Sequence, residues 1–166
     1  SILFMKKGIE EPISQSSTRL LPNQQILSIF REEVFDFLVQ LAVDYIQCDI
    51  GILSFLDKES LWIKSLFSMK EALKPEDLGL VPKRILEDYK KTEFIEIQEK
   101  KIISEIFKSA GEFSANSLLV IPIKCQADVL LGYLILANSN HHILSTEQRS
   151  LLNKTCKQIE LILTSA

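Results

Sequence analysis

The chain has 166 residues, which fits one domain or one domain with a tail. Apolar residues make up 46% of the chain and charged residues 25%, so it can build a core and is not a disordered protein. Its 19 Lys and Arg against 22 Asp and Glu give a net charge of −3 without any basic cluster, so we expect no nucleic-acid partner.

Residues 1–22 contain Gly8, Pro12 and a Ser-rich tract, and we expect an arm or linker there, followed by one domain over residues 23–166. That domain begins with a long helix over residues 23–47, because apolar residues recur there at steps of three and four. The recurring residues are Ile26, Phe30, Val34, Phe37, Leu41 and Tyr45.

The apolar period changes to two after this helix. Residues 49–56 and 61–67 predict a hairpin whose two faces are both largely apolar, and residues 93–97 predict a short strand. Residues 117–123 and 129–138 have the strongest strand pattern and predict a second hairpin.

Helices are expected between and after the hairpins. Pro82 is expected to open a short helix, where its missing N–H costs nothing, and residues 102–108 predict another. The last helix starts at Ser145, which matches a capping box with Gln148. It has two apolar stripes, so one can cover the sheet while the other needs a second partner. The stripes are Leu152, Cys156, Ile159 and Leu163, and Leu151, Leu161 and Ile162.

This order of elements predicts an α+β domain in three layers. The sheet is antiparallel, the N- and C-terminal helices cover one face, and a lid of loops and short helices covers the other.

Four segments resemble those of a GAF domain, in the same order. Residues 49–57 (DIGILSFLD) resemble the first strand of that family, and residues 118–124 (LLVIPIK) resemble its strand that ends in Pro, an apolar residue and a base. Residues 130–138 (LLGYLILAN) resemble its last strand, and residues 144–147 (LSTE) resemble the lead-in to its last helix. The resemblance covers about residues 23–164, and a PAS-like domain is the alternative.

The resemblance implies a non-catalytic sensory domain of the kind used in bacterial signalling, which binds a small molecule and controls an attached output such as a nucleotide cyclase or histidine kinase. It also implies a homodimer through helices 23–47 and 146–164. Because the sequence begins with Ser1 and contains no output domain, we expect it to be part of a longer chain. The alternative function is a dimerisation or protein-interaction module without a ligand, which the second stripe of the last helix favours.

The resemblance places a ligand between the sheet and the irregular middle of the chain. Alternation puts Ile52 and Ser54 on one face of their strand, and Tyr133 and Ile135 on one face of theirs. The basic pair after Pro82 suits a phosphate or carboxylate, because a helix start offers free N–H groups. A filled core and a solvated basic pair would give the same patterns. The candidate ligand-binding residues are Ile52, Ser54, Leu66, Leu80, Val81, Lys83, Arg84, Phe113, Ser114, Asn116, Tyr133 and Ile135.

A cyclic nucleotide is the first ligand to test, and we expect no covalent cofactor and no metal. The signature of the phosphodiesterase GAF domains is largely absent. Asn138 is followed by Ser139 instead of Lys, Leu144 stands in place of Phe, and Glu147 and Gln148 replace the acidic pair. The sequence therefore weakens the nucleotide interpretation without removing it.

Signals of an enzyme are weak, because the sequence has no Gly-rich phosphate loop and no Ser/His/Asp grouping. A thiol-dependent methionine sulfoxide reductase is the least favoured alternative, since Cys48, Cys125 and Cys156 fall on separate elements. A bilin would need a thiol within residues 68–116, and this segment has none. Three cysteines, an odd number at wide spacing, are typical of a reducing compartment, so we expect a cytoplasmic protein. No CxxC pair occurs, so the sequence has neither a zinc ribbon nor a thioredoxin-like motif. No apolar run reaches the roughly 18 residues of a membrane span, so we expect no membrane insertion.

Overall fold

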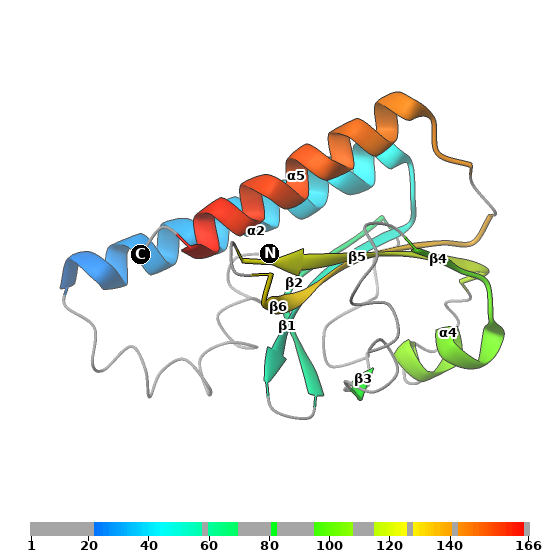
Figure 1. Ribbon diagram of the computed structural model, residues 1–166, viewed down its shortest axis with the longest axis horizontal. Coiled ribbons are helices and arrows are strands. Elements are labelled where there is room, and N and C mark those ends of the chain that lie inside the picture. The colour runs from blue at the N-terminus through cyan, green and yellow to red at the C-terminus, as the bar shows by residue number, and fades with distance from the viewer. Residues whose placement is uncertain are drawn as a thin grey trace.

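The computed structural model describes residues 22–57, 60–69, 81–82, 95–107, 115–125, 128–140 and 143–164. These residues form six strands and three helices around one sheet (Figure 1). The strands are β1 (Ile50–Asp57), β2 (Ser60–Ser68), β3 (Val81–Pro82), β4 (Ile95–Ile97), β5 (Ser117–Lys124) and β6 (Leu130–Asn138). The helices are α2 (Pro22–Ile46), α4 (Lys100–Ile106) and α5 (Thr146–Thr164).

The sheet has the strand order β3-β2-β1-β6-β5-β4, and all neighbouring strands are antiparallel. β1 and β6 form its centre. Successive residues of a strand point to opposite faces, so these two strands supply side chains to both sides of the sheet. Leu53 and Leu134 are paired and face one side, whereas Ile52 and Ile135 are paired and face the other.

The terminal helices α2 and α5 lie side by side on one face of the sheet, and α4 lies on the other (Figure 1). We call the buried cluster under α2 and α5 the helix-side core; it includes Val39, Leu53, Leu134 and Ile159. The cluster on the opposite face, called the lid-side core, includes Ile103 of α4. The predicted three layers, with both terminal helices on one face, are therefore confirmed.

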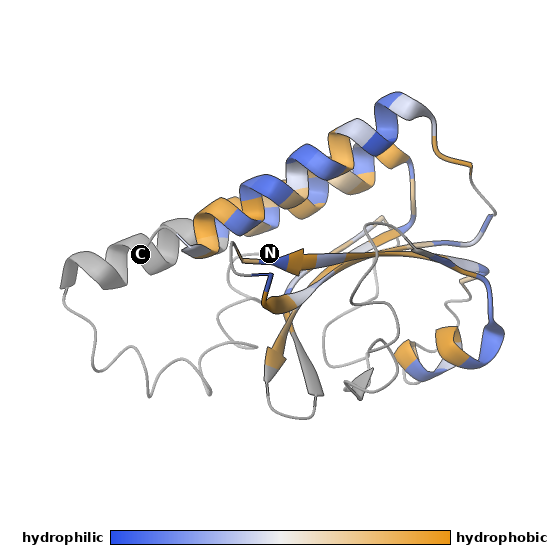
Figure 2. Ribbon diagram, viewed as in Figure 1, coloured by the Kyte–Doolittle hydropathy of each residue, from blue (hydrophilic) through white to orange (hydrophobic). Residues whose placement is uncertain are grey.

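The apolar stripe that predicted the first helix does not face the sheet. Val34, Phe37, Leu41 and Tyr45 are exposed, and Phe37 retains 62% of its accessible surface. The residues of α2 that enter the helix-side core are Phe35, Leu38, Val39, Ala42, Val43 and Ile46. The second half of α2 is thus apolar on two sides. Figure 2 shows hydrophobic residues next to hydrophilic ones in the layer that α2 and α5 form.

The last helix begins as the sequence predicted. The Ser145 hydroxyl accepts a hydrogen bond from the Gln148 N–H at 3.1 Å, and the Ser145 N–H donates to the Gln148 side chain at 3.0 Å. This reciprocal capping box satisfies two backbone N–H groups at the start of α5. Leu152, Cys156 and Ile159 of the first stripe are buried, as expected, whereas Leu161 of the second stripe is exposed.

Pro82 lies in a strand and not at the start of a helix, so the expectation of a helix start is wrong for Pro82, while the residues of the expected helix after it lie outside the described residues. Val81 and Pro82 form β3, which pairs with Leu61 and Ser60 at the edge of the sheet. Proline lacks a backbone N–H, so an edge strand tolerates it as well as a helix start does, and the sequence alone does not distinguish these positions.

Two glycines allow the layers and strands to approach closely. A Cβ on Gly51 would lie 2.5 Å from Val43 Cγ2 and 2.9 Å from Val39 Cγ1, so glycine lets α2 pack directly onto β1. A Cβ on Gly132 would lie 1.9 Å from the Ser54 carbonyl oxygen, beside the irregularity between Leu53 and Ser54. Both positions therefore require the absence of a side chain.

In the described part of the chain, no helix has the length and apolar character needed to cross a membrane.

Candidate functional site

The structure describes the side chains of half of the twelve candidate ligand-binding residues. Those of Ile52, Ser54, Leu66, Asn116, Tyr133 and Ile135 are described. Leu80, Lys83, Arg84, Phe113 and Ser114 lie outside the described residues, and Val81 is placed only through its backbone in β3.

The two central strands bring four of the candidates together on the α4 side of the sheet. Ile52 is paired with Ile135, and Ser54 is paired with Tyr133. The four side chains retain only 1–2% of their accessible surface. The Ser54 hydroxyl donates to the Tyr133 carbonyl oxygen at 3.3 Å. The polar group that the sequence placed in this apolar wall is therefore hydrogen-bonded to the neighbouring strand.

The helix α4 covers part of this wall. Ile103, Ile106 and Phe107 belong to the same buried cluster as Ile52 and Tyr133. The described side chains on this side of the sheet thus form one buried apolar cluster.

Leu66 and Asn116 differ in their relation to this wall. Leu66 is paired with Ile52 from the neighbouring strand and packs against the lid-side core. Asn116 is exposed, and its side-chain amide donates to the Ser139 carbonyl oxygen. Because its N–H also donates to the Asn138 carbonyl oxygen at 2.9 Å, Asn116 holds the start of β5 against the end of β6.

The three thiols are free, and two of them are poor nucleophiles. Burial raises the pKa of the Cys48 thiol to about 12, and burial also raises the pKa of the Cys156 thiol strongly. A thiol with such a pKa is almost entirely protonated at neutral pH, and the thiolate is the reactive form. Cys125 follows β5 and is half-buried.

A cavity of about 500 Å³ lies on the opposite side of the sheet from the predicted ligand site, between α5 and the end of β5. Lys124, Cys125 and Asp128 line it from β5 and the following turn, and Lys157 and Glu160 line it from α5. From their places on separate elements, the cysteines were not expected to lie near one another, yet Cys125 and Cys156 line this same cavity. The cavity was not predictable from local sequence patterns, because its two walls are 36 residues apart at the Lys124–Glu160 contact.

A second cavity, of about 130 Å³, lies near the segment that leads into α5. It is lined by Cys48, Ser117, Ile143 and Arg149, among others. Within the described residues, no three His, Cys, Asp or Glu side chains are grouped as metal ligands.

No protein-family model matches this sequence, and no curated protein matches it either. Solved structures do match. The GAF domain of PixJ from Thermosynechococcus elongatus, in its blue-light-absorbing form, has a TM-score of 0.63 at 14% identity, covering 84% of this chain and 88% of that one. The GAF domain of an Acinetobacter phosphoenolpyruvate-protein phosphotransferase has a TM-score of 0.57 at 17% identity, covering 82% and 83%.

The chain has the GAF fold. A third similar structure, the phycocyanobilin-bound GAF domain of a cyanobacterial phytochrome, extends over 97% of this chain and 94% of its own, with a TM-score of 0.61 at 11% identity. The predicted GAF-like fold is thus confirmed, and the PAS-like alternative is set aside. At these identities the similarity establishes the fold of this chain and does not establish its function.

Proposed function

We propose that this GAF domain is a non-catalytic sensor that binds a small molecule on the α4 side of its sheet and controls an attached signalling output. The observation that carries the proposal is that adjacent residues of β1 and β6 build the two cores. Ile52 and Tyr133 belong to the lid-side core, and their neighbours Leu53 and Leu134 belong to the helix-side core. A ligand that rearranges the first core therefore moves strands on which α2 and α5 are packed.

The ends of α2 and α5 suit the transfer of such a movement to another domain. The two helices run antiparallel, so the start of α2 and the end of α5 lie at the same end of the molecule (Figure 1). An output joined after α5, such as a nucleotide cyclase or a histidine kinase, would respond to the position of this helix end. A ligand shifts that position only by its difference in affinity between the two arrangements.

A cyclic nucleotide remains the first ligand to test, and a bilin is the second. One of the similar GAF domains is bound to phycocyanobilin, which supports a small organic ligand as a class. Because residues 68–116 of this chain have no cysteine, we expect any bilin to be held without a thioether bond in this segment.

The direct test is thermal unfolding with a panel of cyclic mononucleotides, cyclic dinucleotides and phycocyanobilin. A ligand should stabilise the domain by RT ln(1 + [L]/Kd), so the melting temperature should rise with ligand concentration. Ser54→Ala should weaken the binding, because Ser54 is the buried hydroxyl of the proposed wall. Ser65→Ala is the matched control, since Ser65 is equally buried but faces Asp36 of α2. No response to any member of the panel would count against these ligands.

We expect no enzymatic activity from the thiols. The raised pKa values of Cys48 and Cys156 disfavour the thiolate that a methionine sulfoxide reductase would need. A Cys125→Ser variant and the unmodified protein should both fail to reduce free methionine sulfoxide. Turnover that disappears in this variant would establish the reductase function instead.

A homodimer formed through α2 and α5 is our second proposal, and the exposed stripe of α2 favours it. Val34, Phe37, Leu41 and Tyr45 recur every three or four residues along one solvent-facing side of the helix. Such a stripe loses its contact with water when a second helix packs on it.

Light scattering at increasing protein concentration tests this proposal. Phe37→Glu should convert the dimer to a monomer because it places a charge in the interface. Met69→Glu is the control, since Met69 is exposed to a similar extent, 60% against 62%, but follows β2 instead of lying on a terminal helix. A protein that remains monomeric at high concentration, or an equal effect of both substitutions, would contradict the dimer.

A further inference from the structure

The cavity between α5 and the end of β5 is separate from the proposed sensor site. It borders the helix-side core through Ile121 and Cys156, whereas the sensor site belongs to the lid-side core. Its volume of about 500 Å³ lies within the range of cavities that hold small ligands. The cavity is therefore large enough for a small ligand distinct from that of the proposed sensor site.

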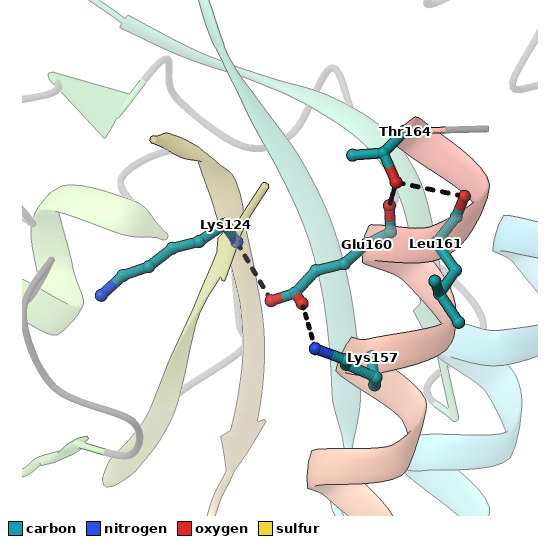
Figure 3. Close-up of polar contacts among 5 residues, drawn as sticks. All are labelled: Lys124, Lys157, Glu160, Leu161 and Thr164. Carbon is teal, nitrogen blue, oxygen red and sulfur yellow. Dashed lines mark hydrogen bonds and ion pairs between the residues drawn. The ribbon is translucent and has the colours of Figure 1, made fainter. Parts of the chain in front are cut away.

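Glu160 is the central charged group of this cavity. Figure 3 shows its side chain reaching from α5 toward the end of β5, where one carboxylate oxygen accepts a hydrogen bond from the Lys124 N–H at 3.2 Å. The other oxygen lies 3.8 Å from Lys157 Nζ. Since 3.8 Å exceeds the length of a hydrogen bond, this oxygen and this ammonium attract each other without a direct bond.

The ammonium groups of the two lysines occupy different places. The Lys124 side chain points away from Glu160 (Figure 3), and its Nζ lies 3.5 Å from Asp128 Oδ1 on the turn after β5. In the described part of the chain, Lys157 has Glu160 as its ion-pair partner, and its side chain is 71% exposed. Lys157 thus keeps hydrogen-bond donors that a ligand can use.

The residues that line the cavity disfavour two common classes of ligand, simple ions and nucleobases. Two lysines and two acids line it, so its formal charge is balanced, and neither a simple anion nor a simple cation meets a uniform field. None of its described lining residues is aromatic, so a nucleobase has no ring to stack on. Ile121 and Leu161 give it an apolar part beside the charged pair.

We infer that this cavity binds a small zwitterion of the amino-acid type. Its carboxylate accepts hydrogen bonds from the Lys157 ammonium, its ammonium donates to the free oxygen of Glu160, and an apolar side chain contacts Ile121 and Leu161. Each charge of such a ligand meets the opposite charge, and so Glu160 and Lys157 both gain a charge-assisted hydrogen bond that they do not make with each other at 3.8 Å.

The site also has a consequence for α5. Glu160 lies one turn before the end of this helix, and the Thr164 hydroxyl donates to the Glu160 carbonyl oxygen at 2.8 Å. A ligand held by Glu160 therefore binds both the last turns of α5 and the end of β5, and it fixes the helix end that we propose to join the output.

Isothermal titration with L-leucine, to about 10 mM so that a millimolar Kd is detected, tests the inference. Leucinamide and 4-methylpentanoate are the matched probes, because each keeps the side chain and loses one of the two charges. We expect leucine to bind at least about tenfold more tightly than either probe, since each loses a charge-assisted hydrogen bond.

Variants then locate the binding. Lys157→Met and Glu160→Gln should each weaken leucine binding by about tenfold or more, and Glu160→Gln keeps an acceptor for the Lys124 N–H. Lys154→Met is the control, because Lys154 is exposed on α5 but does not line the cavity. Ser54→Ala should leave leucine binding unchanged, which separates this site from the proposed sensor site. Absence of leucine binding, binding of either probe as tight as that of leucine, or unchanged binding in both cavity variants would overturn the inference.

Discussion

On one face of the sheet the core lies under two long helices of 25 and 19 residues, whereas on the other face the described chain contributes one helix of 7 residues. The helix-side core is held by α2, which packs onto β1 at Gly51, and by the capped helix α5. A long helix packed on a sheet resists local rearrangement, while a short helix opens at a smaller cost. We therefore expect the helix side to provide more of the stability of the fold and the α4 side to rearrange more readily.

Two adjacent substitutions in β6 test this difference between the two faces most directly. Leu134 and Ile135 are both buried to within 1%, and they face the helix side and the lid side respectively. We expect Leu134→Ala to lower the free energy of unfolding by about 4 kcal/mol, because the two long helices cannot move in to fill the space that the removed side chain leaves. Ile135→Ala should cost about 2 kcal/mol, because the α4 side can relax.

Urea unfolding of both variants, with equal m-values as a check on the two-state assumption, gives these costs. Equal losses would show that the two faces are equally rigid, and a larger loss for Ile135→Ala would show that the α4 side is the more rigid one.

Gly51→Ala tests how closely α2 is packed on the sheet. The added methyl group would lie 2.5 Å from Val43 Cγ2, so the helix or its side chains must move. We expect a loss of about 2 kcal/mol in the free energy of unfolding, measured by urea denaturation. The double variant Gly51→Ala/Val43→Ala should recover part of this loss because it removes the contacting methyl groups; a double variant with additive losses would argue against this contact.

Ser145→Ala tests the contribution of the capping box. It removes the oxygen that accepts the Gln148 N–H at 3.1 Å, and so we expect a loss of about 1 kcal/mol from the free energy of unfolding. Ser150→Ala is the control, because Ser150 is exposed within the same helix and alanine is the better helix former there. The control should be neutral or slightly stabilising in the same thermal or urea assay. A loss in Ser150→Ala as large as that in Ser145→Ala would argue against the cap.

The smallest expected effect is a pH dependence at Asp36, on the side of α2 that faces β2. The Ser65 hydroxyl donates to Asp36 Oδ1 at 2.7 Å, but Asp36 Oδ2 is buried without a hydrogen-bond partner among the described residues. Burial is the largest cause of a raised pKa of this carboxyl, opposed by Ser65 and by the nearby Lys64 and reinforced by Glu33. The protonated carboxyl therefore favours the folded chain more than the ionised carboxyl does. This contribution to stability is fully present below pH 3.8, the ordinary pKa of the group, and is lost as the pH rises through the raised pKa.

Asp36→Asn keeps an acceptor for Ser65 and removes the ionisation. Relative to the unsubstituted protein, the variant should therefore gain stability as the pH rises above about 4. Urea unfolding between pH 4 and pH 7 measures the difference. A difference that stays constant with pH would show that Asp36 ionises as readily in the folded chain as in the unfolded one.

Features that depend on neighbouring residues could be predicted from the sequence, whereas features that depend on packing between distant elements could not. The capping box at Ser145 was predictable because both partners lie within one turn. The four candidates on β1 and β6 were predictable as wall residues because side chains alternate along a strand. The face of α2 that meets the sheet was not predictable, because Val34 and Phe35 begin two apolar stripes with similar spacing.

The cavity on the helix side could not be predicted for a related reason. Lys124 and Glu160 carry no local sign of contact, since they lie 36 residues apart on a strand and a helix. The short sequence patterns around Lys157 and Asp128 indicate only solvated charges. Their arrangement around a shared cavity follows from the packing of α5 against β5.

The sequence by itself determined the order of the elements, the main strands and the start of the last helix, because each depends on side-chain period or on contacts within a few residues. The order of the elements then predicted three layers, and the resemblance of four segments predicted the GAF fold. Only the tertiary structure decided that Pro82 lies in an edge strand, which stripe of α2 is buried, and which charged groups meet between α5 and β5. Those features depend on packing between elements distant in the chain, and several arrangements satisfy the same local pattern equally well.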